Sequence, residues 1–156
     1  MPSVGDLAPD FELPDQNGQP VRLSALRGQT TVLYFYPRAD TPGCTTQACG
    51  VRDHAAAYDG IDARVIGVSP DPVAAVRKFA DKYDLGFTLL ADEDHAVADA
   101  YGTWGEKSMY GKTYMGVQRA TFIIDADGRI AKVFPKVSPK THDDVVLKAL
   151  SALTSA

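Results

Sequence analysis

Short apolar runs rich in β-branched and aromatic residues recur along the chain, and stretches with helical spacing separate most of them. Runs of this kind predict buried strands. Strands are expected at residues 30–35, 63–69, 87–90, 119–124 and 130–134. Two shorter runs, 10–13 and 20–23, flank Asn17-Gly18, a dipeptide typical of hairpin turns, and they predict an N-terminal β-hairpin.

The helices are expected to alternate with these strands. Thr41-Pro42 combines a hydroxyl residue suited to the N-cap with proline at the first helical position, so a helix is predicted from here to about residue 60. Apolar residues share one face of a second helix over 73–80. Further helices are expected over 96–101 and from Thr141 onward.

Residues 102–117 are rich in glycine and aromatic side chains but show no clear period, so we expect a loop there. Strand–helix–strand order elsewhere implies parallel pairing through right-handed crossovers. The last two strands flank the turn 125–129 and are expected to pair antiparallel. The pattern predicts an α/β, thioredoxin-like fold, with a mixed central sheet flanked by helices and an N-terminal β-hairpin. Its length suits one domain over residues 1–156.

Composition excludes several classes of function. The formal net charge of −4 argues against a nucleic-acid partner, which would need a basic face. No apolar run approaches the ~20 residues that span a bilayer. The first residues carry neither a basic nor an apolar segment, so no signal peptide is expected and a cytoplasmic location is predicted. In a reducing compartment, two cysteines favour catalysis or metal binding over a structural disulfide.

Cys44 falls in the first turn of the helix that begins at Thr41-Pro42. Backbone N–H groups there lack partners within the helix, and the helix dipole is positive, so a thiolate is favoured. No histidine lies close in sequence, and activation would need a cation instead. Arg119, which opens an apolar strand, is one candidate, and Arg38 is a second.

The second cysteine, Cys49, lies five residues further on. On an unbroken helix this spacing places the two roughly 140° apart around the axis, with Cα atoms about 8–9 Å apart. A disulfide usually needs Cα atoms closer than about 7 Å, so a bond between them requires the helix to open. Thr45, Thr46 and Gly50 weaken this stretch as a helix and keep that cost small.

Simpler interpretations exist for these residues. Free cysteine often packs as a small apolar core residue. The cysteines and His54, His95 and His142 show no zinc-ligand spacing, so no metal or other cofactor is expected, and each histidine is most simply a surface residue.

The stretch around the cysteines resembles the peroxiredoxin family. Pro37-x-x-x-Thr41-x-x-Cys44 is similar to the active-site pattern of peroxiredoxins, and the wider run to Cys49 resembles their Q type, also called bacterioferritin-comigratory proteins. The resemblance covers essentially the whole chain, including the segments 5–11, 104–111 and 116–122.

This resemblance implies that Cys44 is the peroxidatic cysteine and Cys49 the resolving one, with Pro37, Thr41 and Arg119 at the other active-site positions. It implies reduction of hydrogen peroxide and organic hydroperoxides without metal or flavin, through a sulfenic acid and an intramolecular disulfide. The expected reductant is thioredoxin or a similar dithiol. We expect a monomer, with a weak dimer as the alternative.

Two other functions are compatible with a thioredoxin-like fold, because fold does not fix function. A disulfide oxidoreductase acting on protein thiols would be expected to carry CxxC in place of CxxxxC. A redox sensor would use the same thiols without multiple turnovers.

Overall fold

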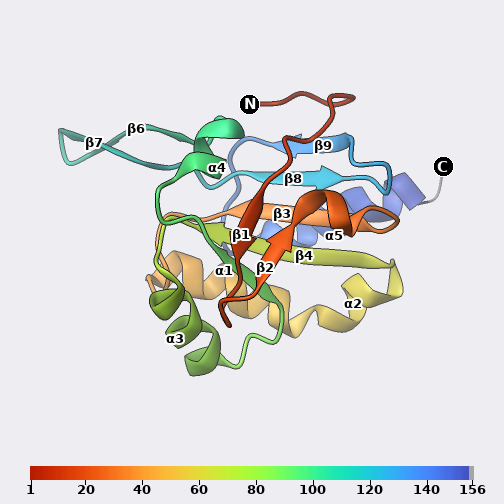
Figure 1. The fold of residues 1–156 in the computed structure, drawn as a ribbon, viewed down its shortest axis with the longest axis horizontal. Coiled ribbons are helices and arrows are strands. Elements are labelled where there is room, and N and C mark those ends of the chain that lie inside the picture. The colour runs from red at the N-terminus through yellow and green to blue at the C-terminus, as the bar shows by residue number, and fades with distance from the viewer. Residues whose placement is uncertain (155–156) are drawn as a thin grey trace.

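A computed structural model of the chain describes residues 1–154. Its centre is a five-stranded sheet in the order β5-β4-β3-β8-β9 (Figure 1). The strands are β3 (Thr30–Phe35), β4 (Ala63–Ser69), β5 (Thr88–Ala91), β8 (Thr121–Ile124) and β9 (Ile130–Phe134). β3, β4 and β5 run parallel, whereas β8 and β9 pair antiparallel. The predicted mixed sheet and thioredoxin-like fold are confirmed.

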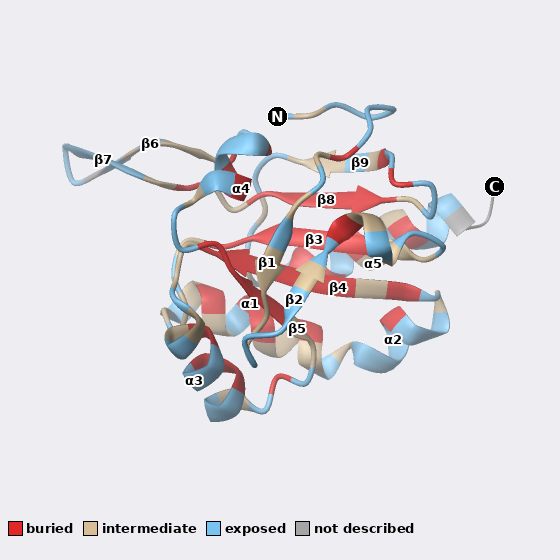
Figure 2. Cartoon of the chain, viewed as in Figure 1, coloured by how far each residue is buried: buried red, intermediate tan, exposed pale blue. Residues whose placement is uncertain are grey.

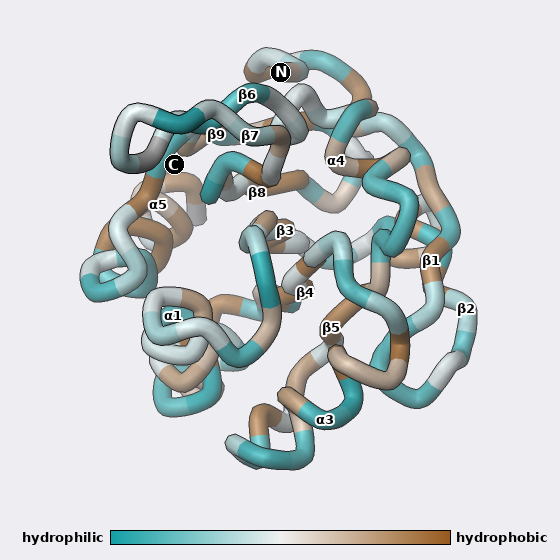
Figure 3. The backbone as a smooth tube through the Cα atoms, turned by 90° about the vertical axis from the view of Figure 1, so that its left-hand side faces the viewer, coloured by the Kyte–Doolittle hydropathy of each residue, from teal (hydrophilic) through white to brown (hydrophobic). Residues whose placement is uncertain are grey.

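Helices and the N-terminal hairpin cover the two faces of this sheet. They are α1 (Pro42–Asp53), α2 (Ala55–Gly60), α3 (Val73–Tyr83), α4 (Ala96–Ala100), α5 (His142–Thr154), β1 (Glu12–Pro14), β2 (Pro20–Arg22) and the 3₁₀ turn η1 (Leu23–Leu26). Figure 3 shows α1 and α5 on one side of the sheet, and β1, β2 and α4 on the other. The predicted N-terminal hairpin is confirmed by the antiparallel pairing of β1 with β2.

The central strand β3 is buried on both faces, which explains its continuous apolar sequence (Figure 2). Successive side chains of a strand point to opposite faces. Val32 and Tyr34 therefore enter the core under α1 and α5, while Leu33 and Phe35 enter the core under the N-terminal hairpin and α4. Side chains of β3 therefore pack into a core on each face of the sheet, and these cores hold the end of β3, from which the chain leads to α1.

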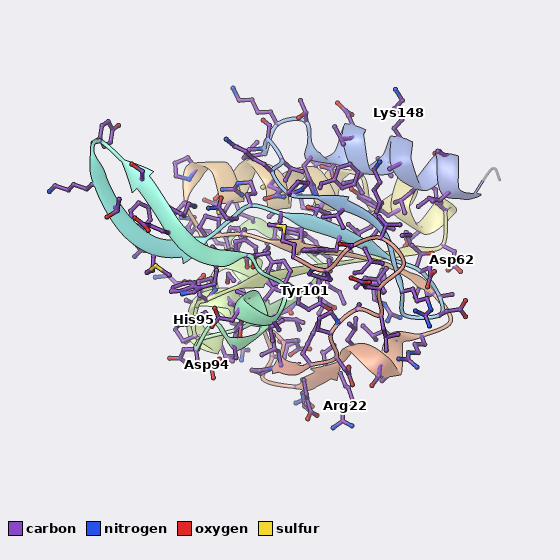
Figure 4. All side chains as sticks on the ribbon, turned by 90° about the horizontal axis from the view of Figure 1, so that it is seen from above. Arg22, Asp62, Asp94, His95, Tyr101 and Lys148 are labelled. Carbon is purple, nitrogen blue, oxygen red and sulfur yellow. The ribbon has the colours of Figure 1, made fainter. Side chains whose placement is uncertain are left out.

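The prediction of a loop over residues 102–117 is wrong. The segment forms an antiparallel hairpin of β6 (Trp104–Met109) and β7 (Lys112–Val117), which reaches away from the body of the molecule (Figures 1 and 4). Residues 112–115 are exposed, so no buried face imposes an alternating pattern on the sequence. The signal that could have revealed the hairpin is Tyr110-Gly111, where both residues have positive φ, as a two-residue hairpin turn requires.

Two other expectations also need correction. The predicted helix to residue 60 divides at His54, which separates α1 from α2. His142 is completely buried and not on the surface: it is the first residue of α5 and packs against the sheet, where its Nε2 hydrogen-bonds the Thr121 hydroxyl of β8 at 3.0 Å. Within residues 1–154, no helix is both long enough and apolar enough to cross a membrane.

Candidate active site

Cys44 lies at the point where the chain leaves the sheet and enters α1. Its side chain is only 1% exposed, and it occupies the first turn of the helix, as predicted. Thr41 is the N-cap residue, but its hydroxyl does not cap the helix; it donates to the carbonyl of Arg38 at 2.9 Å. The thiol is therefore buried beside the unpaired N–H groups at the positive end of a 12-residue helix.

Arg119 is the cation that contacts this thiol. Its Nη2 donates to Sγ of Cys44 at 3.3 Å. The backbone brings Arg119 here because β8 pairs antiparallel with β3, and the N–H of Phe35 bonds the carbonyl of Ala120 at 2.8 Å. The start of β8 therefore lies beside the end of β3, from which α1 begins a few residues later.

Gln47 holds the other arm of the same guanidinium. Arg119 Nη1 donates to Gln47 Oε1 at 2.7 Å, and Gln47 is fully buried one turn after Cys44 on the same face of α1. Through these two contacts, the guanidinium of Arg119 connects the thiol of Cys44 with the side-chain amide of Gln47. Sequence reasoning missed Gln47, although its i+3 spacing from Cys44 was a usable signal.

The absence of a side chain at Gly43 makes room for the arginine. A Cβ at this position would lie 3.2 Å from Arg119 Nη2 and 3.4 Å from Cγ of Pro139. That is tighter than ordinary van der Waals contact, so a larger residue would push the guanidinium away from the thiol. Pro139, which precedes α5, is a second neighbour of the site that the sequence did not reveal.

The other predicted site residues lie at different distances from this centre. Pro37 is half-buried two residues after the end of β3, in the connection that leads to Thr41. Arg38, the second candidate cation, is exposed, and the contact that it makes in this connection is through its backbone carbonyl. Arg119 therefore supplies the positive charge at Cys44. The residue pattern alone had left Arg38 as a second candidate, whereas the family resemblance had implied Arg119.

Cys49 is half-buried on the same continuous helix, and both cysteines are free thiols. Because α1 is unbroken from Pro42 to Asp53, the helical separation of about 140° and 8–9 Å applies to them as predicted. The structure does not bring the two sulfur atoms together. A disulfide between them requires at least part of α1 to unwind.

Two tyrosines from β3 and its extension lie in the same core as Cys44, with ring centroids 5.5 Å apart. Burial raises the pKa of Tyr34 and the pKa of Tyr36 well above their usual range, and negative charge on Cys44 acts in the same direction. Both hydroxyls therefore stay protonated and neutral around the thiol. Among residues 1–154, no group of three or more His, Cys, Asp or Glu side chains is placed to hold a metal ion.

This arrangement suits nucleophilic redox chemistry. A buried cysteine at a helix N-terminus in contact with an arginine favours the thiolate, which is the nucleophilic form. Together with a thioredoxin-like fold, it defines the class of the protein as a thiol-dependent redox protein.

Comparison with known proteins narrows this class. Residues 4–133 match the AhpC/TSA family. The peroxiredoxin Bcp of Escherichia coli is 51% identical over 147 residues, which cover 94% of each chain.

Solved structures agree. The peroxidoxin BcpB of Mycobacterium tuberculosis superposes with a TM-score of 0.85 at 41% identity, covering 96% of this chain and 97% of that one. The bacterioferritin comigratory protein of Xanthomonas campestris gives a TM-score of 0.87 at 35% identity, covering 92% and 91%. The chain belongs to the AhpC/TSA family, as a peroxiredoxin of the Q or Bcp type.

Proposed function

We propose that this peroxiredoxin reduces hydrogen peroxide and organic hydroperoxides through Cys44, with Cys49 as the resolving thiol and a dithiol protein such as thioredoxin as the reductant. The observation that carries the proposal is the 3.3 Å contact of Arg119 Nη2 with Cys44 Sγ at the N-terminus of α1. A cation held there favours the nucleophilic thiolate and lies where charge develops during peroxide cleavage.

In the first step, the Cys44 thiolate attacks the terminal oxygen of the peroxide. An S–O bond forms and the O–O bond breaks, so that Cys44 is oxidised to a sulfenic acid and the peroxide is reduced. The departing hydroxide or alkoxide takes a proton and leaves as water or an alcohol. Arg119 stabilises the negative charge as it moves from sulfur to the leaving oxygen.

Thr41 and Pro37 are proposed to shape the pocket for this step. The Thr41 hydroxyl proton is used by the Arg38 carbonyl, so its oxygen is available as an acceptor for the O–H of a peroxide. Pro37, half-buried after β3, offers no N–H group and would shield the thiolate from water.

In the second step, the Cys49 thiolate attacks the sulfur atom of the Cys44 sulfenic acid. An S–S bond forms, the S–O bond breaks, and the departing hydroxide takes a proton to become water. The disulfide forms after α1 opens, because the helical separation is too large for a direct bond. A dithiol protein then supplies two electrons: its thiols become a disulfide and both cysteines return to the reduced state. The proposal for organic substrates draws on the bacterioferritin comigratory protein of Xanthomonas campestris, which has alkyl peroxide reduction activity.

The test is mass spectrometry of the protein after one equivalent of hydrogen peroxide, before and after adding thioredoxin. The wild type is expected to lose the mass of two hydrogen atoms when it forms an intramolecular disulfide, and to regain that mass when thioredoxin reduces it. Cys49→Ser is expected to accumulate one sulfenic acid per chain on Cys44, and Cys44→Ser to lose peroxidase turnover. Sulfenic acid trapped on Cys49 in place of Cys44 would overturn the assignment of the two thiols.

A parallel assay separates this function from disulfide reduction on other proteins. Peroxide consumption in the presence of thioredoxin is compared with reduction of insulin disulfides. Multiple turnovers of peroxide with little insulin reduction support the peroxidase. Insulin reduction without peroxide turnover contradicts it, and one turnover only would identify a sensor.

A further inference from the structure

Lys107 is a half-buried lysine midway along β6 in the projecting hairpin. Its Nζ donates to the carbonyl of Val117 at 2.9 Å. Val117 ends β7 and lies two residues before Arg119, whose guanidinium contacts Cys44. The lysine head is therefore anchored on the segment that delivers the active-site arginine.

The hairpin is built to let the lysine reach this position. Lys107 pairs with Tyr114 across the two strands, and Gly116 is the diagonal neighbour on the same face. A Cβ on Gly116 would lie 3.1 Å from Cδ of Lys107, so the lysine stem crosses the glycine. The stem consequently points toward the body of the molecule and not toward the hairpin tip, which extends outward in Figure 4.

No carboxylate in the described part of the chain forms an ion pair with Lys107, unlike Lys82, which pairs with Asp40. Half-buried lysines without such a partner are costly, because an ammonium loses hydration that one carbonyl replaces only in part. A neighbouring thiolate would compensate for this cost.

We propose that Lys107 is a second cation of the active site, which acts with Arg119 to favour the Cys44 thiolate. The inference rests on the proposed role of Cys44 as the nucleophile. A backbone carbonyl holds the ammonium group of Lys107 in place. The positive charge of this group acts on the reacting sulfur through space.

The electrostatics of the site agree with this placement. Burial lowers the pKa of Lys107, and the nearby guanidinium of Arg119 lowers this pKa further, while negative charge on Cys44 acts in the opposite direction. Coulomb interactions are mutual, so a charge on Cys44 that favours the ammonium is itself favoured by it. Tyr34 and Tyr36 lie in the same core as Cys44, and burial keeps their hydroxyls neutral, so neither adds a charge beside the thiol.

The test compares three variants of Lys107 by the pH profile of Cys44 alkylation with iodoacetamide and of its oxidation by hydrogen peroxide. Lys107→Gln keeps a donor for the Val117 carbonyl but removes the charge, Lys107→Arg keeps both, and Lys107→Met removes both. Lys112→Met is the matched control, an exposed lysine on β7 of the same hairpin.

The midpoint of both profiles is expected to move to higher pH by roughly half a unit to one unit in the Gln and Met variants. Arg at this position is expected to restore the wild-type midpoint, and the control is expected to match the wild type. A Gln variant with the wild-type midpoint would overturn the inference, because only the hydrogen bond would then matter.

The outcome also separates this inference from the proposed function. If peroxide oxidises Cys44 of the wild type and all variants share the wild-type midpoint, the peroxidase proposal stands and the role of Lys107 is refuted. Wild-type Cys44 that resists peroxide refutes both.

Discussion

The backbone of Gly50 in α1 lies directly against the carboxylate of Asp143 in α5. A Cβ built on Gly50 would collide with Oδ2 of Asp143, so the two helices can lie this close together only because residue 50 has no side chain. The opposite oxygen of the carboxylate accepts a hydrogen bond from the buried Tyr58 hydroxyl of α2. Asp143 thus connects three helices, and its contact with α1 comes one residue after Cys49.

This relationship changes the meaning of Gly50. From the sequence, glycine here only weakens α1 as a helix. In the structure it is one point at which α5 contacts α1, on the segment that must unwind for the two cysteines to bond. The same residue therefore lowers the intrinsic stability of the helix and enables a tertiary contact that holds it.

Gly50→Ala is expected to destabilise the reduced protein by about 1–3 kcal/mol, because overpacking against Asp143 outweighs the gain in helix propensity. Urea unfolding of the reduced protein measures this. Gly60→Ala in α2 is the control, since nothing lies within 4 Å of a Cβ there and no loss is expected. In an Asp143→Ala background the Gly50 substitution should cost little; an equal cost in both backgrounds would contradict the contact.

Tyr58→Phe is expected to destabilise the protein by about 1–3 kcal/mol, because it removes a donor from the buried carboxylate of Asp143. Burial, and then the bond to Asp143, raises the pKa of Tyr58 well above its usual range, so the hydroxyl is a donor at every ordinary pH. Thermal unfolding tests this. Tyr34→Phe is the comparison: its buried hydroxyl has no hydrogen-bond partner within residues 1–154, so its removal should cost much less.

Arg119→Met is expected to slow oxidation of Cys44 by hydrogen peroxide by about 10²-fold or more, the usual loss when one donor to a developing anion is removed. Stopped-flow single turnovers at neutral pH give the rate constant. Arg38→Met serves as the control, because that side chain is exposed and is expected to change the rate little. Equal rates for Arg119→Met and wild type would reduce Arg119 to a structural residue.

Oxidation is expected to loosen α1 while the sheet stays protected. Because helical Cys44 and Cys49 are too far apart to bond, the disulfide form should exchange amide hydrogens faster across roughly residues 43–52 than the reduced form does. Hydrogen-exchange mass spectrometry of both forms measures this. Cys49→Ser treated with peroxide should keep the protected pattern. Equal protection in the two wild-type forms would point to an intermolecular disulfide, which non-reducing gels detect.

Asp40 gives a prediction for pH. Hydrogen bonds from Lys82, and then from Tyr83, lower the pKa of this carboxyl in the folded protein. The stabilisation from these bonds is therefore present above the ordinary carboxyl value of about 3.9 and is lost as pH falls through the lower folded value.

Lys82→Met is expected to raise the pKa of Asp40 toward the ordinary value, and NMR titration of the carboxyl measures it. Lys78→Met, which removes a charge that acts on Asp40 without a hydrogen bond, is expected to have a smaller effect. A larger effect of Lys78→Met would show that long-range charge dominates.

Elements whose signals are local could be predicted from the sequence alone. The apolar run before Thr41-Pro42 predicted a buried strand, and Thr41-Pro42 predicted the start of a helix. Cys44, two residues after Pro42, was therefore expected in the first turn of that helix. The five-residue spacing to Cys49 likewise fixed their separation once the helix was continuous. These predictions held because strand burial and helix initiation depend on residues that are neighbours in the chain.

Which distant residues contact the thiol depends on how the elements pack against one another. The contact of Arg119 with Cys44 depends on the antiparallel register of β8 with β3, which brings together two residues 75 positions apart in the chain. No local pattern in the sequence indicates such a contact. The packing of α5 on α1 at Gly50 was hidden for the same reason. The hairpin of β6 and β7 was not predicted because its exposed strands bury no continuous face. Their residues therefore show no alternation of apolar and polar side chains.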